Sequence, residues 1–305
     1  MRKQLNRFLH YLNVEKGYSQ GTIGAYQLDI GNGLIPFLHQ RGKFGIEEVT
    51  RDDIRAYLDY AAVEKGNSGV TRARKLAAIK SFFNYLVENE ELKANPAASI
   101  RSPRIPEKEP VYLSEQECLR FLETIAQKAK PQVRERDMAI AILFLHAGLR
   151  VSELTNLKLT NVDLHGQQVK ITRKRNKEQY LHLNGEAAAA LANYLHSRPQ
   201  AQNGSFFVGT NGGNLTRSYV YGLIRRYLKL AGIDKGKRGP HILRHTFCTR
   251  LHQKGVTPFT IKDLAGHKSL NTTMRYVRIE NKEQAEAVDR LEFGVANSWY
   301  NNGNE

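Results

Sequence analysis

Four prolines stand close together about a third of the way along the chain, and they limit how it can fold. They lie within NPAASIRSPRIPEKEPVYLS, residues 95–114, and proline cannot continue a helix because it lacks the amide donor and clashes with the preceding turn. The chain of 305 residues is also longer than one ordinary hydrophobic core serves. We therefore expect two domains, 1–98 and 112–293, joined by a linker at 99–111 and followed by a flexible tail at 294–305.

The N-terminal domain has the pattern of a helical module. Leu5, Phe8 and Leu12 recur at helical spacing, and TRARKLAAIKSFFNYLVEN at 71–89 continues this periodicity. Thr50 precedes an acidic turn, as is typical of a helix N-cap. The pattern predicts four or five helices.

The second domain is expected to be helical with one β interruption. Ser114 and Glu117 form a capping-box pattern, which predicts a helix start, and Gly148 follows an apolar helical run. Residues 161–183, NVDLHGQQVKITRKRNKEQYLHL, alternate in the manner of strands around two turn signals. The fold class is therefore mainly α, with a small three-stranded antiparallel sheet in the second domain.

The charge of the chain favours a polyanionic partner. The formal net charge is +16 at pH 7. Residues 1–100 carry 14 Lys and Arg against 11 Asp and Glu, whereas residues 101–305 carry 32 against 19. A basic surplus held mainly by one half of a chain is typical of a nucleic-acid-binding protein.

Several other classes of protein are disfavoured. No apolar run approaches the ~18 residues of a membrane span, and the amphipathic N-terminus MRKQLNRFLHYL lacks the apolar core of an export signal. Two cysteines, Cys118 and Cys248, form neither a disulfide framework nor a metal-ligand spacing. We expect a cytoplasmic protein, associated with the nucleoid.

The segment GPHILRHTFCTRLHQKG, residues 239–255, has the pattern of a phosphate site. Pro240 suits the first turn of a helix, where His241 and Arg244 then lie on one face beside the anion-favouring N-terminus. His245 raises the alternative of a metal pair with His241. A zinc peptidase would need HExxH and a third ligand, and the adjacent arginine would repel a cation, so no metal site is expected.

An arginine and a tyrosine elsewhere are ambiguous when each is taken alone. Arg150, in AGLRVSEL, could be paired structurally or directed at an anion, and Glu153 could hold it in place. Tyr276 is one of 14 tyrosines.

Together, these segments resemble the tyrosine site-specific recombinases, the phage-integrase and Xer family. The similarity spans the whole chain: residues 1–98 look like the family's core-binding domain and residues 112–293 like its catalytic domain. The matching residues are Arg150 in GLRVSEL, the basic turn RKRNKE, His241-x-x-Arg244, Gly266-His267, and Tyr276 in TTMRY.

The resemblance implies a role for each of these residues. Tyr276 would be the nucleophile, and Arg150 and Arg244 would clamp the non-bridging oxygens of the scissile phosphate, because a planar guanidinium matches two oxygens at once. His241 and His267 would complete the pocket, with His241 accepting the tyrosine proton. Glu153 would orient Arg150.

The hairpin departs from the family pattern, which often reads Gly-Lys-Gly-x-Lys-Glu-Arg. Lys174 matches the family's general acid, which protonates the leaving 5′-oxygen. Arg173 and Arg175 replace the two glycines, and Gln179 replaces the arginine. The hairpin is thereby more basic and less flexible, and Lys177 remains a rival to Lys174.

The resemblance also implies how DNA is engaged. Family members act as tetramers, so we expect a homotetramer on two duplexes with inverted half-sites, or an assembly with a partner recombinase. Segment 281–293 is expected to form an amphipathic helix that docks on a neighbouring protomer or packs on its own domain. Candidate DNA contacts, for which a solvated surface is the alternative at the first three, are Arg72, Arg74, Lys75, Arg173, Arg175 and Lys177.

Three functions follow as hypotheses. The resemblance implies a recombinase that cuts DNA through a 3′-phosphotyrosine, with chemistry like that of a type IB topoisomerase, for integration, excision or resolution. It would need neither a metal ion nor ATP. A non-catalytic, sequence-specific DNA-binding regulator would share the charge and helices, and a metal-dependent nuclease would use the histidines.

Overall fold

The computed structural model describes residues 1–105, 110–173, 177–236 and 239–276. The chain folds into two compact units, Met1–Lys108 and Glu109–Glu305. The division falls within the proline-bearing segment, where helices cannot continue. Among the described residues, none of the helices combines the length and the apolar character that crossing a membrane requires.

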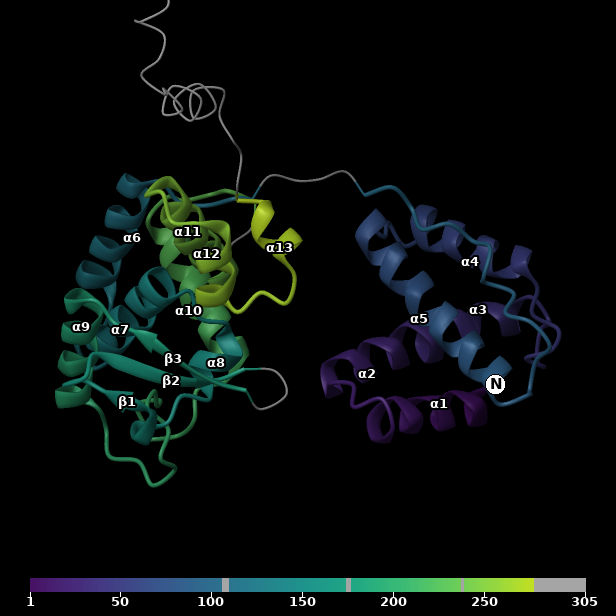
Figure 1. The fold of residues 1–305 in the computed structure, drawn as a ribbon, viewed down its shortest axis with the longest axis horizontal. Coiled ribbons are helices and arrows are strands. Elements are labelled where there is room, and N and C mark those ends of the chain that lie inside the picture. Colours follow the sequence, from purple (N-terminus) through teal and green to yellow (C-terminus); the bar gives the residue numbers. More distant parts are fainter. Residues whose placement is uncertain (106–109, 174–176, 237–238, 277–305) are drawn as a thin grey trace, which may run out of the picture. The chain divides into compact units, whose positions relative to one another are not determined.

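The first unit is helical throughout its described elements (Figure 1). Ser19, Thr50 and Ser68 each accept a hydrogen bond from a first-turn amide and so begin a helix. At Thr50 this cap is a full capping box with Asp53. The elements are α1 (Arg2–Val14), α2 (Gln20–Tyr26), the π-helix η1 (Gln27–Leu34), α3 (Ile35–Gln40), α4 (Arg51–Val63) and α5 (Gly69–Glu88).

The core of the first unit extends further along the chain than the sequence predicted. Phe8 and Phe82 pack together at its centre, with ring centroids 5.4 Å apart. Ala97 and Ile100 are buried in the same core. Ile100 falls inside the expected linker 99–111, but burial of its side chain ties this part of the segment to the first unit.

The π-helix η1 was not expected from the sequence. Its backbone passes close to a buried tyrosine, since a Cβ at Gly33 would lie 2.2 Å from the Tyr57 hydroxyl. That hydroxyl donates a hydrogen bond to the Asp29 carbonyl at 3.2 Å. The wide turn and its glycine therefore make room for Tyr57, in keeping with π-turns that form where a side chain inserts.

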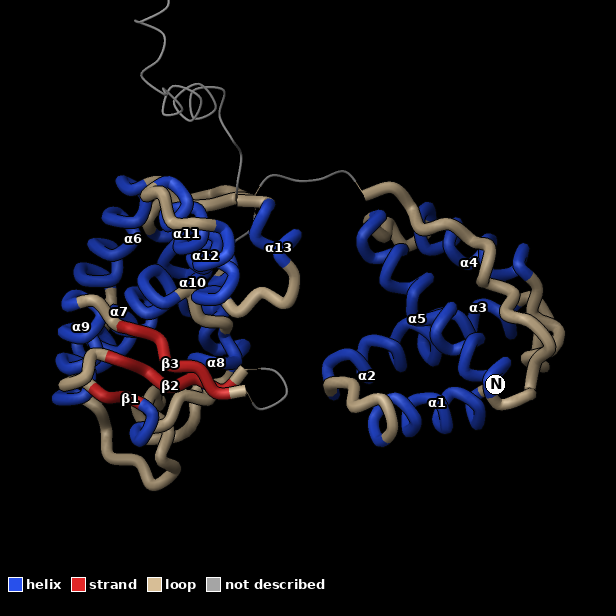
Figure 2. Tube along the Cα trace, in the orientation of Figure 1, coloured by secondary structure: helices blue, strands red, loops and turns tan. Residues whose placement is uncertain are grey.

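The second unit combines helices with a three-stranded antiparallel sheet, which confirms the predicted fold class (Figure 2). The strands follow the order β1-β2-β3, and Val169 pairs with Leu181 in its register. The elements are α6 (Glu115–Lys128), α7 (Pro131–Ala147), α8 (Val151–Thr155), the 3-10 helix η2 (Leu159–Asn161), β1 (Val162–Asp163), β2 (Gln168–Thr172), β3 (Glu178–His182), α9 (Gly185–Ser197), α10 (Arg217–Leu230), α11 (Pro240–Gln253), α12 (Pro258–Ala265) and α13 (Leu270–Met274).

Helix α7 lies at the centre of the second unit and packs against α9 and α11. A buried polar cluster joins it to α10. Arg136 donates to Asp137 at 2.8 Å and to the Tyr219 hydroxyl at 2.6 Å, while the Tyr227 hydroxyl donates to Asp137 at 2.8 Å. Because each buried charge has partners, the cluster avoids the cost of an unpaired ion.

Candidate active site

The site begins where α7 ends. Gly148 adopts a left-handed conformation, with φ 57°, and caps the helix. A Cβ there would lie 2.2 Å from the Phe247 ring, so glycine is required by both backbone and space. The turn delivers Arg150 to the start of α8. The Glu153 carboxylate accepts from the Arg150 amide at 2.8 Å and from its guanidinium at 2.7 Å, which fixes that side chain.

Arg244, on α11, lies at the same turn as Gly148. Its guanidinium is buried and donates to the carbonyl oxygens of Gly148 and Ala265. Burial, followed by repulsion from Arg150, lowers the pKa of Arg244 to about 10. The group therefore stays charged at neutral pH.

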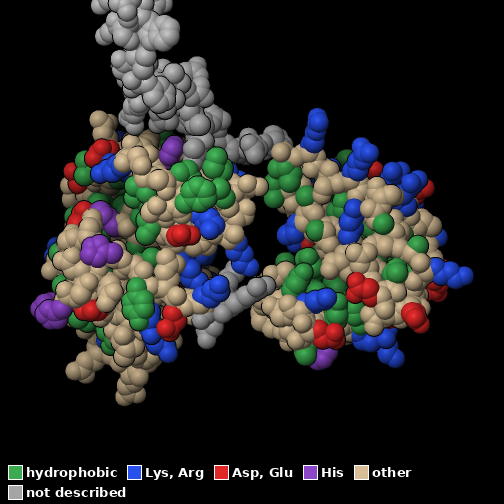
Figure 3. All heavy atoms as spheres, viewed as in Figure 1, with side chains coloured by type: hydrophobic (Ala, Val, Ile, Leu, Met, Phe, Trp, Pro, Cys, Tyr) green, Lys and Arg blue, Asp and Glu red, His purple; other side chains and the backbone are tan. Residues whose placement is uncertain are grey.

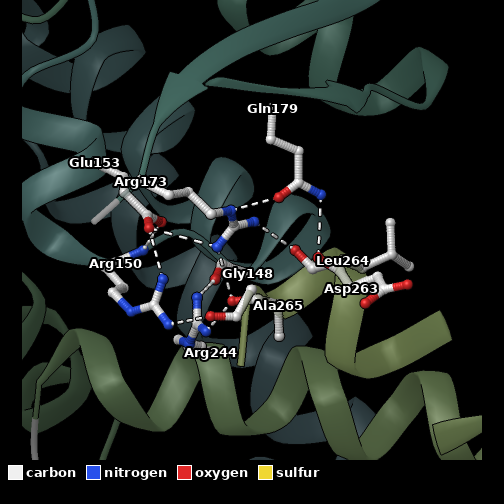
Figure 4. A network of polar contacts seen from close by, with 10 residues as sticks. Gly148, Arg150, Glu153, Arg173, Gln179, Arg244, Asp263, Leu264 and Ala265 are labelled. Atoms are coloured by element: carbon white, nitrogen blue, oxygen red, sulfur yellow. Dashed lines mark hydrogen bonds and ion pairs between the residues drawn. The ribbon is translucent and has the colours of Figure 1, made fainter. Parts of the chain in front are cut away.

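The carboxyl end of α12 is where the arginines converge (Figure 4). The Arg150 guanidinium donates to the Gly266 carbonyl at 2.6 Å, and Arg244 donates to the Ala265 carbonyl. Arg173 donates to the carbonyls of Leu264 and Ala265, each at 2.8 Å. The last carbonyls of a helix have no partner within it and carry its negative pole, so cations stabilise them.

Arg173, which was expected to contact DNA, is largely enclosed by the protein. Its side chain is 10% exposed, against 30% for Arg150. It also donates to the Gln179 amide oxygen at 2.5 Å and lies 3.4 Å from the Glu153 carboxylate. The structure thus commits this guanidinium to acceptors of the protein itself.

His267 lies just beyond this helix end. Its Nδ1 lies 2.8 Å from the Thr273 hydroxyl, and its ring stacks against Tyr276 with centroids 6.1 Å apart. Burial, then the charges of Arg244 and Arg150, lower the pKa of His267 to about 4. The imidazole is therefore neutral at pH 7.

Tyr276 is buried, with 7% of its surface exposed, and lies within electrostatic range of Arg244. Its hydroxyl lies 2.5 Å from His245 Nδ1, and it packs in a small cluster that includes Phe247 and Cys248. Burial and the neighbouring Cys248 raise the pKa of Tyr276 well above its ordinary value. In this arrangement the phenol is protonated.

His245 is the contact that sequence reasoning missed. It entered there only as a possible metal partner of His241, whereas the structure places it against Tyr276. Among the described residues, no group of three or more His, Cys, Asp or Glu side chains is arranged to hold a metal ion. A histidine directly after Arg244 was the available signal. The role of His245 could not be inferred from the sequence, because the residue that it contacts, Tyr276, is 31 positions away.

His241 stands at the start of α11 with its side chain exposed. Its ring lies against Tyr221 of α10, with centroids 5.9 Å apart. The N-terminal position on α11 agrees with the helix start predicted from Pro240.

A surface cavity of about 740 Å³ opens beside these groups. Most of its charged lining residues are basic, although Glu178 and Asp263 also line it. An exposed basic hollow of this kind suits a phosphate backbone. The cationic lining residues are Arg150, Arg173, Lys177, Lys262 and Lys268, and the neutral His267 lines the cavity with them.

Several predicted site residues lie outside the described part of the chain. These are Lys174 and Arg175 of the hairpin, the helix expected at 281–293 and the tail at 294–305. Lys177 is described and is exposed.

The candidate DNA contacts of the first unit lie near the start of α5. Arg74 pairs with Asp29, and Lys75 lies 3.3 Å from the same carboxylate and 3.1 Å from the Tyr57 hydroxyl. Arg72 is half-buried. Figure 3 shows Lys and Arg side chains spread over the visible face of this unit, with Asp and Glu among them.

Comparisons with known proteins agree with the predicted resemblance. The profile of the Phage integrase family matches residues 112–283, and that of the phage integrase N-terminal SAM-like domain matches residues 5–90. The tyrosine recombinase XerC of Caldanaerobacter subterraneus subsp. tengcongensis is 32% identical, over 94% of this chain and 86% of its own. XerC of Herpetosiphon aurantiacus is 34% identical, over 92% of each chain.

Solved structures agree at the level of the fold. XerH recombinase bound to a palindromic difH substrate, in a post-cleavage complex, superposes with a TM-score of 0.76 at 23% identity, covering 95% of this chain and 89% of that one. XerA recombinase is 29% identical with a TM-score of 0.52, over 94% and 98% of the two chains. The chain therefore belongs to the phage integrase family and is a site-specific tyrosine recombinase, an enzyme that cleaves and rejoins DNA.

Proposed function

We propose that this recombinase works through a 3′-phosphotyrosine formed by Tyr276, with no metal ion or ATP. The observation that carries the proposal is the convergence of Arg150 and Arg244 on one helix end, beside His267, whose ring stacks on Tyr276. Two fixed guanidiniums supply positive charge where a phosphoryl transition state gains negative charge. One phosphoester replaces another, so the step needs no external energy.

Arg150 and Arg244 have donors left for a phosphate. A guanidinium carries five N–H groups. Hydrogen bonds among the described residues engage two on Arg244, to Gly148 and Ala265, and two on the Arg150 side chain, to Glu153 and Gly266. These bonds hold the planes in place before DNA arrives, and preorganised donors stabilise a transition state without further rearrangement.

The buried nucleophile must move before it reacts. Because Tyr276 is 7% exposed and its hydroxyl is held by His245, the segment that carries it has to shift for the oxygen to reach a DNA phosphate. We assign His245 to holding the hydroxyl in the arrangement described. His241, which the family resemblance favours, would then accept the proton as the phenol oxygen attacks phosphorus.

The leaving group needs a proton of its own. When the bond from phosphorus to the tyrosine oxygen forms, the bond to the 5′-oxygen breaks and its electron pair stays on that oxygen. Lys174 is the proposed donor of the proton, with Lys177, which lines the basic cavity, as its rival. Attack by the 5′-hydroxyl of another strand reverses these steps and reseals the DNA.

The assembly on DNA is inferred from the relatives. XerH was crystallised bound to its difH substrate, and a lambda integrase fragment as a dimer bound to a core site. We propose that domains 1–98 and 112–293 of this chain clamp duplex DNA with inverted half-sites, and that four protomers act on two duplexes. Segment 281–293, which lies outside the described residues, would dock on a neighbouring protomer. Candidate DNA contacts are Arg72, Arg74, Lys75, Arg175 and Lys177.

The cellular task proposed is integration, excision or resolution of DNA in the cytoplasm, at the nucleoid, by this protein alone or with a partner recombinase. The nucleoid is the proposed location because the substrate is DNA. Recombination assays with two sites on one plasmid, compared with sites on two separate plasmids, distinguish excision or resolution from integration.

A covalent-adduct assay tests the chemistry. The protein is incubated in EDTA with a DNA site nicked so that cleavage cannot be reversed, and the products are run on a denaturing gel. We expect a protein–DNA adduct that is lost in Tyr276→Phe and kept in Tyr18→Phe, an exposed tyrosine of the first unit. Binding without an adduct would indicate a regulator, and cleavage abolished by EDTA a nuclease. Strand exchange between two sites separates a recombinase from a type IB topoisomerase.

A further inference from the structure

We propose that Arg173 is a positioning residue that completes an arginine cap on the carboxyl end of α12. The cap holds the Gly266-His267 turn and, through it, the two clamping guanidiniums. This inference rests on the proposed function of Arg150 and Arg244 as the phosphate clamp. Arg173 supplies a third guanidinium, which supports the turn and does not contact DNA.

Acceptors of the protein engage most of the Arg173 guanidinium. Its two terminal nitrogens donate to the carbonyls of Leu264 and Ala265 at 2.8 Å, and Nη1 also lies 3.4 Å from Glu153. Its Nε donates to Gln179 at 2.5 Å. Four of its five N–H groups are thereby engaged, and the side chain is 10% exposed. Such a group has little capacity left for an external phosphate.

The clamping arginines depend on the same helix end. Arg244 donates to the Ala265 carbonyl, which Arg173 also contacts, and Arg150 donates to the Gly266 carbonyl one residue further on. Arg150 and Arg173 also share the Glu153 carboxylate. A shift of these carbonyls would therefore move both clamping guanidiniums.

Removal of Arg173 would leave part of this helix end without its donors. The Gln179 amide also donates to the Asp263 carbonyl at 3.0 Å, so the hairpin strands supply donors to three successive carbonyls. Cations near such an end offset its negative pole. We expect the Gly266-His267 turn to lose its fixed position when this support is removed.

The backbone at Gly266 is matched to Arg173. A Cβ at Gly266 would lie 1.9 Å from Arg173 Nη1, and the residue has φ 62°, a left-handed conformation that favours glycine. The guanidinium thus packs directly on the turn that leads to His267.

The hairpin of this chain differs from the common family pattern at positions 173 and 179. The family pattern often has glycine there and arginine at the position of Gln179. In the sheet, Gln179 pairs with Ile171 across β2 and β3, so Gln179 and Arg173 lie diagonally on one face. An arginine at position 179 would therefore present its guanidinium from the same face of the hairpin as Arg173 does.

The test removes the guanidinium at position 173 and then introduces one at position 179. The full chain is prepared as Arg173→Gly, as Arg173→Gly with Gln179→Arg, and as Arg120→Gly, which removes one exposed arginine of α6 as the charge control. Each variant is measured for melting temperature, for affinity to a DNA site, and for the rate of a single cleavage in EDTA at saturating DNA.

We expect Arg173→Gly to cleave about 100-fold more slowly at saturating DNA, as a misplaced catalytic group would, with its affinity for DNA and its cooperative unfolding kept. The double variant should recover most of that rate, which a general loss of folding would not allow. Arg120→Gly should match the parent protein in affinity and cleavage rate, with a slightly lower melting temperature because glycine within a helix is destabilising.

The inference is overturned if Arg173→Gly cleaves at the parental rate, or if its affinity falls as far as its rate, since Arg173 would then contact DNA. It is also overturned if the folded double variant is no faster than Arg173→Gly. Failure of the proposed function looks different: Arg150→Ala would then cleave as fast as the parent protein, whatever Arg173 does.

Discussion

Glu153 is the residue whose replacement tests the electrostatic reasoning most directly. Its side chain is 3% exposed and accepts from the Arg150 amide and guanidinium, with the Arg173 guanidinium 3.4 Å away. The perturbation is Glu153→Gln, which keeps the shape and removes the charge.

The magnitude follows from the three donors. A glutamine amide group presents N–H in place of one carboxylate oxygen, so the Arg150 amide or a guanidinium would face another donor. One unsatisfied buried donor costs about 1–3 kcal/mol, and breaking a buried ion pair costs about 3–5 kcal/mol. Because Arg150 is 30% exposed and therefore partly screened, we expect the lower part of that range, about 3 kcal/mol.

Urea unfolding of the full chain at pH 7 measures this loss. The matched control is Glu178→Gln, since Glu178 is 56% exposed and pairs with Lys170 at 3.1 Å. An exposed pair contributes at most about 1 kcal/mol. If Glu153→Gln lowered the free energy of unfolding no more than Glu178→Gln does, the reasoning about the buried carboxylate would be refuted.

Further predictions concern the turn, the histidine and the buried cluster. Gly148→Ala should lower the free energy of unfolding by about 1–3 kcal/mol because φ is 57° and the Phe247 ring blocks a Cβ; a thermal scan showing parental stability would contradict this. Since the pKa of His267 is lowered to about 4, the unfolded chain binds a proton between about pH 6.5 and 4 that the folded chain does not, so stability falls as pH falls through that window. His267→Gln should remove part of this loss in urea unfolding at pH 7 and 4.5; an identical loss in both proteins would count against the shift. Asp137→Asn should lower the unfolding free energy by about 3 kcal/mol because Arg136 loses its buried counter-charge, and equal urea midpoints would show that the pair contributes nothing.

The local structure near the site was predictable from short segments. The capping box of Ser114 and Glu117 begins α6, and Pro240 begins α11, as expected. The predicted sheet at 161–183 forms in order β1-β2-β3. Caps, turns and alternation depend on residues within a few positions of one another, so they can be recognised in the sequence.

Other features depended on distant neighbours. The π-helix at Gln27–Leu34 accommodates Tyr57, and Ile100 joins a core built from earlier helices. No short-range pattern marks either one. Packing decided both, because the space and the apolar surface come from elements far away in the chain.

By itself the sequence determined that this chain is a two-domain, mainly helical protein with a basic second half, and its ordered motifs predicted the recombinase family. Only the tertiary structure decided what those side chains touch. Arg173 donates hydrogen bonds to carbonyls 91 and 92 residues away along the chain, and His245 contacts Tyr276, which is 31 residues away. A hydrogen bond needs its atoms within about 3 Å, and residues so far apart along the chain come that close only when the helices and the hairpin have packed.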